Sequence, residues 1–225
     1  MRNTSEDLTS AVEPAVLELR EISKGYSCRQ VLSLVNLRVE AGECLGITGA
    51  NGSGKSTLLR MIAREQRPDS GRILLRGKDI LEDRLYTRNR MGYVPQDNAL
   101  AEELTIGQQL ELWQAARGVQ EPLQAELMEL MGLEPLLRCR VRELSGGMQR
   151  RVSIAMALAA GKEVLVMDEA TTGLDQAYCD ALLEWLAIFL RRGGCILWCS
   201  HRRDELDRLC NRCLCLRDGQ AYWGL

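Results

Sequence analysis

The sequence predicts an α/β fold in which a mostly parallel core sheet carries an antiparallel β subdomain near the N-terminus and an inserted α-helical subdomain. Three observations lead to this prediction. Short apolar runs alternate with helical patterns at both ends of the chain, as in proteins with parallel sheets. A glycine-rich segment lies between one such run and a helix. Residues 97–160 carry helical patterns without strand signals.

β-rich runs open the chain, and a helical pattern follows them: Ala15–Arg20, Leu32–Glu40, Cys44–Thr48 and Ser56–Glu65. In the second run, Leu32 and Leu34 are followed by Leu37 and Val39, an alternation with one break in phase. Such alternation predicts a half-buried antiparallel strand. The third run is shorter and apolar, and it leads directly into the glycine-rich segment.

The middle of the chain predicts helices at Thr105–Arg117 and Pro122–Met131, punctuated by Gly118, Gly132 and Pro135. We therefore expect a helical subdomain over about residues 97–160. Alternating strands and helices then return: Val164–Met167, Gln176–Arg191, Cys195–Cys199, Arg202–Leu209 and a closing hairpin of Arg212–Arg217 with Tyr222. We expect a loosely ordered tail over residues 1–14 and one domain over residues 15–225.

Composition narrows the class of protein. The 225 residues include 29 Lys and Arg against 31 Asp and Glu, so no basic excess predicts a nucleic-acid partner. The first fourteen residues lack the apolar segment of a secretory signal. No apolar stretch approaches the roughly 20 residues that span a bilayer. We expect a chain that does not cross a membrane by itself.

The chain has nine cysteines, and several lie near the only histidine: Cys195, Cys199, His201, Cys210, Cys213 and Cys215. One interpretation is a metal or iron–sulphur site. The other is that Cys195 and Cys199 share a buried strand, with Cys213 and Cys215 on one face of another, as small apolar residues. The spacing favours the second, because only Cys210 and Cys213 form a C-x-x-C pair. Reduced thiols are expected.

The segment GANGSGKST matches the phosphate-binding pattern G-x-x-x-x-G-K-[ST] in full. Its members are Gly49, Ala50, Asn51, Gly52, Ser53, Gly54, Lys55, Ser56 and Thr57. Backbone N–H groups of such a loop turn inward on a polyphosphate, and the following helix adds its positive dipole end. Lys55 reaches the terminal phosphates and the Ser56 hydroxyl can ligate Mg²⁺. The sequence therefore predicts a P-loop NTPase core that binds ATP.

An acidic pair, Asp168 and Glu169, ends the apolar run Val164–Met167. A carboxylate at the end of a buried strand is where such proteins hold Mg²⁺, so Asp168 is the predicted metal residue. Glu169 can polarise an attacking water as a general base.

The segment LSGGMQR at Leu144–Arg150, together with the phosphate loop, closely resembles the signature of ABC-type ATPases. The resemblance extends from about Val16 to Trp223. It implies that two subunits close head to tail, so that Ser145, Gly146 and Gly147 of one complete the ATP site of the other.

Weaker motifs follow the family's order, and the resemblance implies a role for each. Tyr26 matches the aromatic residue that stacks on adenine. Gln96, in MGYVPQ, matches the glutamine that senses the metal and γ-phosphate where a membrane partner docks. Asp175, in TGLD, matches the residue that faces the other subunit. His201 matches the switch histidine at the γ-phosphate, which assigns it to the nucleotide instead of a metal cluster.

Two positions depart from the family's pattern. The family usually has proline after the acidic pair, where this chain has Ala170. In the helical subdomain, this chain has Gln108 where the family has an acidic residue. That position belongs to the contact with the partner. The predicted catalytic set of Lys55, Gln96, Glu169 and His201 is retained, and we expect an active ATPase.

The resemblance implies the ATP-hydrolysing subunit of an ABC transporter, on the cytoplasmic face of the cell membrane with a separate integral membrane subunit. The dimer is either a homodimer or a heterodimer, and the substrate is set by the membrane subunit. The short C-terminus favours an exporter-type cassette. The alternatives are a soluble ABC ATPase, of which iron–sulphur assembly fits better than repair or translation, and a metal-binding module built on the C-terminal cysteines.

Overall fold

The computed structural model describes residues 15–118 and 124–224. The expected tail over residues 1–14 and the predicted helix start at Pro122 lie outside the described residues. The strands are β1 (Leu17–Tyr26), β2 (Arg29–Val39), β3 (Cys44–Thr48), β4 (Ser70–Leu75), β5 (Lys78–Asp79), β6 (Met91–Val94), β7 (Val164–Asp168), β8 (Cys195–Cys199), β9 (Arg212–Arg217) and β10 (Gln220–Gly224).

The α-helices are α1 (Lys55–Ile62), α2 (Arg84–Arg88), α3 (Ile106–Arg117), α4 (Ala125–Leu130), α5 (Gly146–Ala160), α6 (Gln176–Arg191) and α7 (Arg203–Leu209). Short 3-10 turns, η1 and η2, lie at Glu134–Leu136 and Val141–Glu143. None of the helices in the described ranges combines the length and the apolar character that crossing a bilayer requires.

The core is a six-stranded sheet in the order β10-β9-β3-β8-β7-β6. The ladders from β9 to β6 are parallel, and only the β9–β10 hairpin is antiparallel. The predicted α/β fold with a mostly parallel sheet is therefore confirmed. Because the strands are parallel, the loops after β3, β6, β7 and β8 meet at one edge of the sheet, where ligands of such folds bind.

A second sheet has the order β2-β1-β4-β5, and its ladders are antiparallel, as the N-terminal pattern predicted. The break in phase within β2 lies at Leu34, which has a φ of 49° and a 60% exposed side chain. We expected Leu34 to share the buried face with Leu32. The backbone irregularity instead turns Leu34 outward, and Val35, Leu37 and Val39 continue the buried face.

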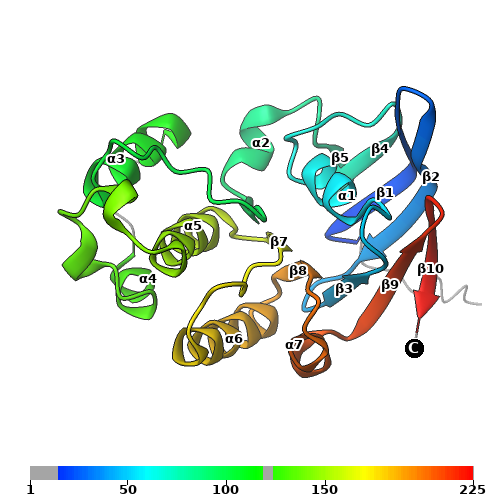
Figure 1. The fold of residues 1–225 in the computed structure, drawn as a ribbon. Coiled ribbons are helices and arrows are strands. Elements are labelled where there is room, and N and C mark those ends of the chain that lie inside the picture. Colours follow the sequence, from blue (N-terminus) through cyan, green and yellow to red (C-terminus); the bar gives the residue numbers. More distant parts are fainter. Residues whose placement is uncertain (1–14, 119–123, 225) are drawn as a thin grey trace, which may run out of the picture.

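The helices α3 and α4 form a lobe beside the core sheet (Figure 1). Helix α5 links this lobe to the core, because it packs against β6 as well as against α3 and α4. Helix α5 lies close to β6, because a Cβ built on Gly92 of β6 would lie 1.9 Å from the carbonyl oxygen of Ala157 in α5. The stretch expected as helical therefore ends against the sheet.

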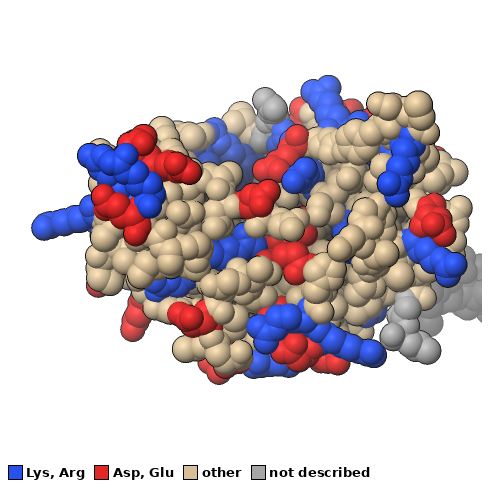
Figure 2. Space-filling view, in the orientation of Figure 1, with Lys and Arg blue, Asp and Glu red and all other residues tan. Residues whose placement is uncertain are grey.

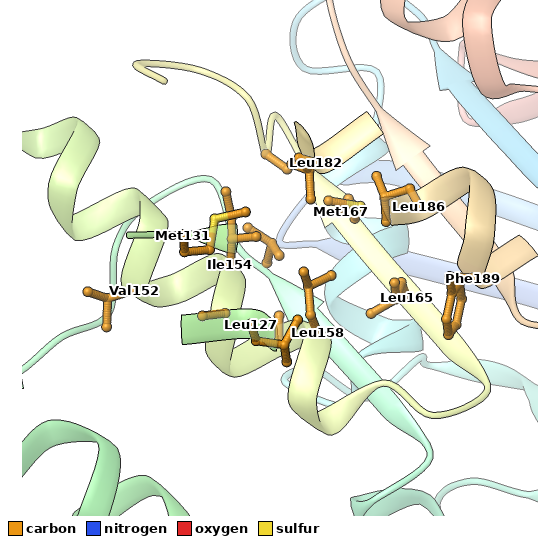
Figure 3. Packing of buried hydrophobic residues seen from close by; sticks show 14 of the residues in the cluster. Leu127, Met131, Val152, Ile154, Leu158, Leu165, Met167, Leu182, Leu186 and Phe189 are labelled. Carbon is orange, nitrogen blue, oxygen red and sulfur yellow. The ribbon is translucent and has the colours of Figure 1, made fainter. Parts of the chain in front are cut away.

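Apolar side chains of α4, α5, β7 and α6 share one buried cluster (Figure 3). Leu158 of α5, Leu165 of β7 and Leu186 of α6 belong to it, and each is at most 4% exposed. This packing fixes the start of α5 relative to the end of β7, and both positions matter for the site.

Candidate nucleotide site

The phosphate-binding segment forms the turn between β3 and α1. Gly49 and Gly54 have φ values of 138° and 104°, which suit glycine. A Cβ built on Gly49 would lie 2.4 Å from the Leu216 carbonyl oxygen, so the turn also has no room for a side chain. These constraints explain why glycine occupies both positions of the pattern.

Lys55 opens α1 and is only 9% exposed. Its ammonium donates to the carbonyl oxygens of Gly49 at 2.8 Å and Ala50 at 3.1 Å. Asn51 and Gly52 are exposed at the tip of the turn, whereas Ser56 and Thr57 are half-buried in the first turn of the helix. The segment thus offers a cation, hydroxyl groups and a helix N-terminus to one small space, a combination that suits a polyphosphate.

Asp168 ends β7 and is 1% exposed. Its Oδ2 is buried and has no hydrogen-bond partner among the described residues. An unpaired buried carboxylate oxygen is costly, and a cation is the partner that would satisfy it. Helix α1, which carries Ser56, packs against β7 and β8. A hydroxyl and a carboxylate are oxygen ligands of the kind Mg²⁺ prefers, so these residues fit the metal.

Glu169 and His201 lie side by side after β7 and β8. The His201 Nε2 is 3.3 Å from the Glu169 Oε1, and the His201 backbone N–H donates to Oε2 at 3.4 Å. The Glu169 N–H in turn donates to the Cys199 carbonyl oxygen at 2.9 Å. Burial, followed by the charges of Asp168 and Glu169, raises the pKa of the neighbouring Cys199 thiol. The structure brings the predicted base and switch residue together.

Gln96 lies exposed in the loop after β6, and this loop contacts the start of α5. The Asn98 amide donates to the Gly146 carbonyl oxygen at 3.4 Å. Ser145 is the N-cap of α5, and its hydroxyl accepts from the Met148 N–H at 3.3 Å. The glutamine loop and the LSGGMQR segment are therefore neighbours.

Other predicted residues lie exposed on the surface. Ser145, Gly146 and Asp175 are exposed, and Asp175 starts α6 without a side-chain capping bond. Figure 1 shows α5 and α1 on different sides of β7. The start of α5 is thus available to another molecule.

A protein-family model described as "ABC transporter" matches residues 32–172. The chain belongs to the ABC transporter family. A curated relative, the Nod factor export ATP-binding protein I of Rhizobium etli, is 38% identical over 90% of this chain. The match covers 65% of that relative, and 69% of the Burkholderia orbicola protein of the same name, so the chain spans about two thirds of the length of these relatives.

Solved structures agree with this assignment. An ATP-binding subunit of an ABC transporter is similar at 30% identity with a TM-score of 0.85, over 93% of this chain and 89% of that one. A dimeric ATP-binding cassette bound to ADP and Pi in a post-hydrolysis state is 26% identical with a TM-score of 0.79, over 91% and 96% of the two chains. The predicted resemblance to ABC ATP-binding subunits and the P-loop fold are confirmed.

Tyr26 ends β1 of the cassette and is 47% exposed. Its hydroxyl accepts a hydrogen bond from Gln66, and the Lys24 ammonium lies 5.8 Å from its ring centroid. A hollow of about 550 Å³ lies on the phosphate loop, apart from Tyr26, and its lining includes Arg29 and Val31. The Arg29 Nη2 donates to the Gly52 carbonyl oxygen at 3.3 Å. No sequence motif predicts this contact.

Sequence reasoning also missed two buried charged residues of the cassette. Glu205 is 1% exposed, and its Oε2 accepts from the hydroxyls of Thr171 and Ser200, each at 2.8 Å. It thereby ties the loop after β7 to the loop after β8. The second is Arg150, the last residue of LSGGMQR, which is 2% exposed and to which the motif assigns no function.

The cysteines take the positions of the second interpretation. Cys195 and Cys199 are buried in β8, and Cys213 and Cys215 are half-buried in β9. Cys210 contacts Cys44, with the sulphur atoms 3.4 Å apart. Within the described ranges, no group of three or more His, Cys, Asp and Glu side chains is arranged to hold a metal ion.

Proposed function

We propose that this cassette binds ATP with Mg²⁺ and hydrolyses it to drive transport through a separate membrane subunit. The observation that carries the proposal is the meeting of Lys55, Asp168, Glu169 and His201 at one edge of the parallel sheet. Together these side chains offer a cation, a metal ligand, a base and a switch residue to one phosphate chain.

We assign each of these residues a role in that reaction. Lys55 exchanges its two loop carbonyls for phosphate oxygens, and the turn's backbone N–H groups with Ser53 and Thr57 surround the β-phosphate. Glu169 orients the attacking water, and His201 contacts the γ-phosphate. Tyr26 stacks on the base. Ser56, Asp168 and the Gln96 amide would hold Mg²⁺, which supplies charge neutralisation to the phosphates when bound.

The second half of the site comes from another subunit in this proposal. Ser145, Gly146 and Gly147 present a hydroxyl and a helix N-terminus outward, groups that stabilise phosphoryl oxygens. Asp175, exposed at the start of α6, faces the same partner. The similarity to a dimeric cassette bound to ADP and Pi supports this arrangement, in which the partner is a second copy or a related cassette.

The membrane partner docks, we infer, beside the Gln96 loop. A hollow of about 630 Å³ lies there between the core and the helical lobe. Its lining includes Leu85, Tyr93, Pro95, Trp113 and Met156. The exposed Leu85 and the neighbouring aromatic groups suit a short amphipathic helix of an integral membrane subunit. In this proposal the cassette therefore lies on the cytoplasmic face of the membrane.

The names of the relatives support export as the direction and favour transport over the iron–sulphur assembly alternative. On the face shown in Figure 2, Lys and Arg are interspersed with Asp and Glu, with no continuous basic surface. Co-purification with an integral membrane protein would support the transport role, and a chain that never associates with one would contradict it.

The test of the catalytic assignment is Glu169→Gln. This variant should retain ATP binding, because the phosphate loop is intact, and should lose steady-state hydrolysis by about 100-fold or more. Bound ATP and released phosphate are measured separately. Glu184→Gln, on an exposed position of α6, is the matched control and should hydrolyse ATP at the wild-type rate. Unchanged hydrolysis by Glu169→Gln would refute the assignment.

A further inference from the structure

Arg150 extends from α5 into the catalytic edge of the sheet and is only 2% exposed. Its guanidinium donates to oxygen atoms of the loops after β6 and β7. The acceptors are the carbonyls of Ala170 (2.8 Å), Glu169 (2.8 Å), Asp168 (3.0 Å), Gln96 (3.2 Å) and Pro95, and the Asn98 Oδ1 (3.5 Å). One side chain therefore holds the backbone of the predicted base and of the predicted glutamine loop.

The chemistry of this contact depends on arginine. Guanidinium presents five N–H donors in a rigid plane, so it can bind several carbonyls at once, and it keeps its charge when buried. Burial lowers the pKa of Arg150, and the nearby Asp168 carboxylate opposes that effect. Methionine would fill much of the same space without donating, and lysine would bind only part of the set.

Arg150 lies about 1.4 turns from the exposed start of its helix, about 7.5 Å along the axis from Ser145. Other contacts join the same parts of the chain. The Asn98 amide binds the Gly146 carbonyl oxygen, and a Cβ built on Gly147 would lie 2.4 Å from the Gly173 carbonyl oxygen. The start of α5 is thus coupled to the loops that follow β6 and β7.

We propose that Arg150 is a positioning residue that connects the two ATP sites of the dimer. When Ser145 and Gly147 engage the partner's phosphates, the start of α5 is fixed, and Arg150 fixes Glu169 and Gln96 of its own chain. The consequence is that each site assists hydrolysis in the other. The proposal rests on the proposed function, because it requires hydrolysis at a shared site.

The neighbouring Arg151 provides a matched control. It is also buried, at 8% exposed, and lies on the same helix. Its Nη1 donates to the Met131 carbonyl oxygen at 3.2 Å, and its guanidinium lies 4.3 Å from the ring centroid of Tyr178. Arg151 therefore stabilises the packing of α5 without binding the catalytic loops.

The experiment compares Arg150→Met, Arg150→Lys and Arg151→Met in steady-state ATP hydrolysis. Arg150→Met should lower kcat by about 10- to 100-fold, the effect of a misplaced catalytic group, with the KM for ATP changed by less than about threefold. The Hill coefficient for ATP should fall toward 1. Arg150→Lys should recover part of kcat. Arg151→Met should lower the melting temperature but keep the wild-type kcat per folded molecule and the wild-type cooperativity.

Amide hydrogen exchange supplies a readout that does not depend on turnover. Arg150→Met should speed exchange at the amides of residues 96–98 and 168–171, while exchange in the last turns of α5 stays unchanged. If Arg150→Met does not fold, Arg150→Lys carries the test, with a smaller change at the same amides.

Two results would overturn the proposal. One is a folded Arg150→Met variant with wild-type kcat, cooperativity and exchange. The other is a loss of kcat in Arg150→Met and Arg151→Met alike, in proportion to lost folded protein. Failure of the proposed function gives a different result. Wild-type protein would not hydrolyse ATP, and Glu169→Gln would behave like wild type. The hydrogen-exchange pattern would still show whether Arg150 holds the loops after β6 and β7.

Discussion

Glu169 occupies a backbone conformation that few residues adopt. Its φ of 51° is left-handed and costs a non-glycine residue roughly 1 kcal/mol or more. The surrounding structure holds it there, because its N–H binds the Cys199 carbonyl oxygen and its own carbonyl oxygen accepts from Arg150. This turn directs the carboxylate toward His201 instead of along the strand. The predicted base is therefore placed by its backbone contacts as much as by its position after β7.

At the residue scale, Gly147 should tolerate no side chain. Gly147→Ala puts a methyl group 2.4 Å from the Gly173 carbonyl oxygen, whereas a Cβ at Gly146 meets nothing within 4 Å. We expect Gly147→Ala to lower the free energy of unfolding by about 1–3 kcal/mol through overpacking. Gly146→Ala should be neutral or stabilising by up to about 1 kcal/mol, since alanine favours helix. Urea denaturation of both variants makes the comparison, and equal stabilities would contradict it.

At the element scale, Gln108 has a structural role that the motif comparison did not suggest. It stands where the family has an acidic residue, and we associated that place with partner contact. In the structure, the Thr105 Oγ1 accepts from the Gln108 N–H at 3.2 Å, and the Gln108 Oε1 accepts from the Thr105 N–H at 3.0 Å. This reciprocal pair is a capping box that begins α3. Glutamine and glutamate both supply the acceptor that the capping box needs, which explains why the departure leaves the lobe intact.

Substitution of Gln108 tests that role. Gln108→Ala removes one acceptor at the start of α3 and should cost about 0.5–1 kcal/mol of stability. Gln108→Glu keeps the acceptor and adds a negative charge near the helix N-terminus, so it should stabilise the protein by about 0.3–1 kcal/mol. Thermal unfolding at low salt distinguishes the two. If the Gln108→Ala variant were more stable than the Gln108→Glu variant, the capping box would contribute nothing to stability.

How far the sequence predicts an element depends on what holds that element in place. The bounds of β3, α6 and β8 follow from continuous apolar runs or from helical periodicity, and the structure agrees with them. The elements between residues 66 and 96 were not predicted. Helix α2 has five residues and depends on its Asp83 cap, and β4 pairs with β1, about 50 residues away. Such elements form through contacts that a local pattern does not contain.

The same distinction applies to the site. Lys55, Asp168 and Glu169 occur in motifs whose residue spacing is typical of nucleotide binding. The sequence therefore predicts that they lie together at the edge of the sheet. Arg29, Arg150 and Glu205 act through hydrogen bonds to residues far away in sequence. The place of Arg150 within the signature motif is a sequence signal that could have pointed to it, whereas its burial is known only from the structure. The sequence around Arg29 contains no pattern that predicts its contact with the phosphate loop.

At the scale of the whole molecule, head-to-tail sharing predicts complementation between variants. Lys55→Ala disables a chain's own phosphate loop. Ser145→Asp keeps the helix cap, because aspartate is a good N-cap, but places a carboxylate against the partner's phosphates. In a mixed dimer of a self-pairing chain, both defects fall in one site and the other site is intact.

An equal mixture should therefore hydrolyse ATP faster than either variant alone. Independent sites in a two-fold dimer would give about a quarter of the wild-type rate, and coupling between the sites lowers the rate below that ceiling. Phosphate release from the two variants, separately and mixed, makes the measurement. Wild-type protein mixed with each variant controls for exchange of subunits. A mixture no faster than the average of its components would argue against the shared site.

The contacts of Lys55 also bear on the timing of a transport cycle. Its ammonium already donates to the carbonyl oxygens of Gly49 and Ala50, so arriving phosphate replaces existing bonds instead of satisfying a bare charge. A hydrogen bond to a charged group contributes about 1.5–3 kcal/mol, and the two carbonyl bonds that are given up offset part of that gain. The loop can therefore release its product without first exposing an uncompensated cation. Lys55 thus keeps hydrogen-bond partners both before phosphate arrives and after it leaves, which suits a site that is filled and emptied in every cycle.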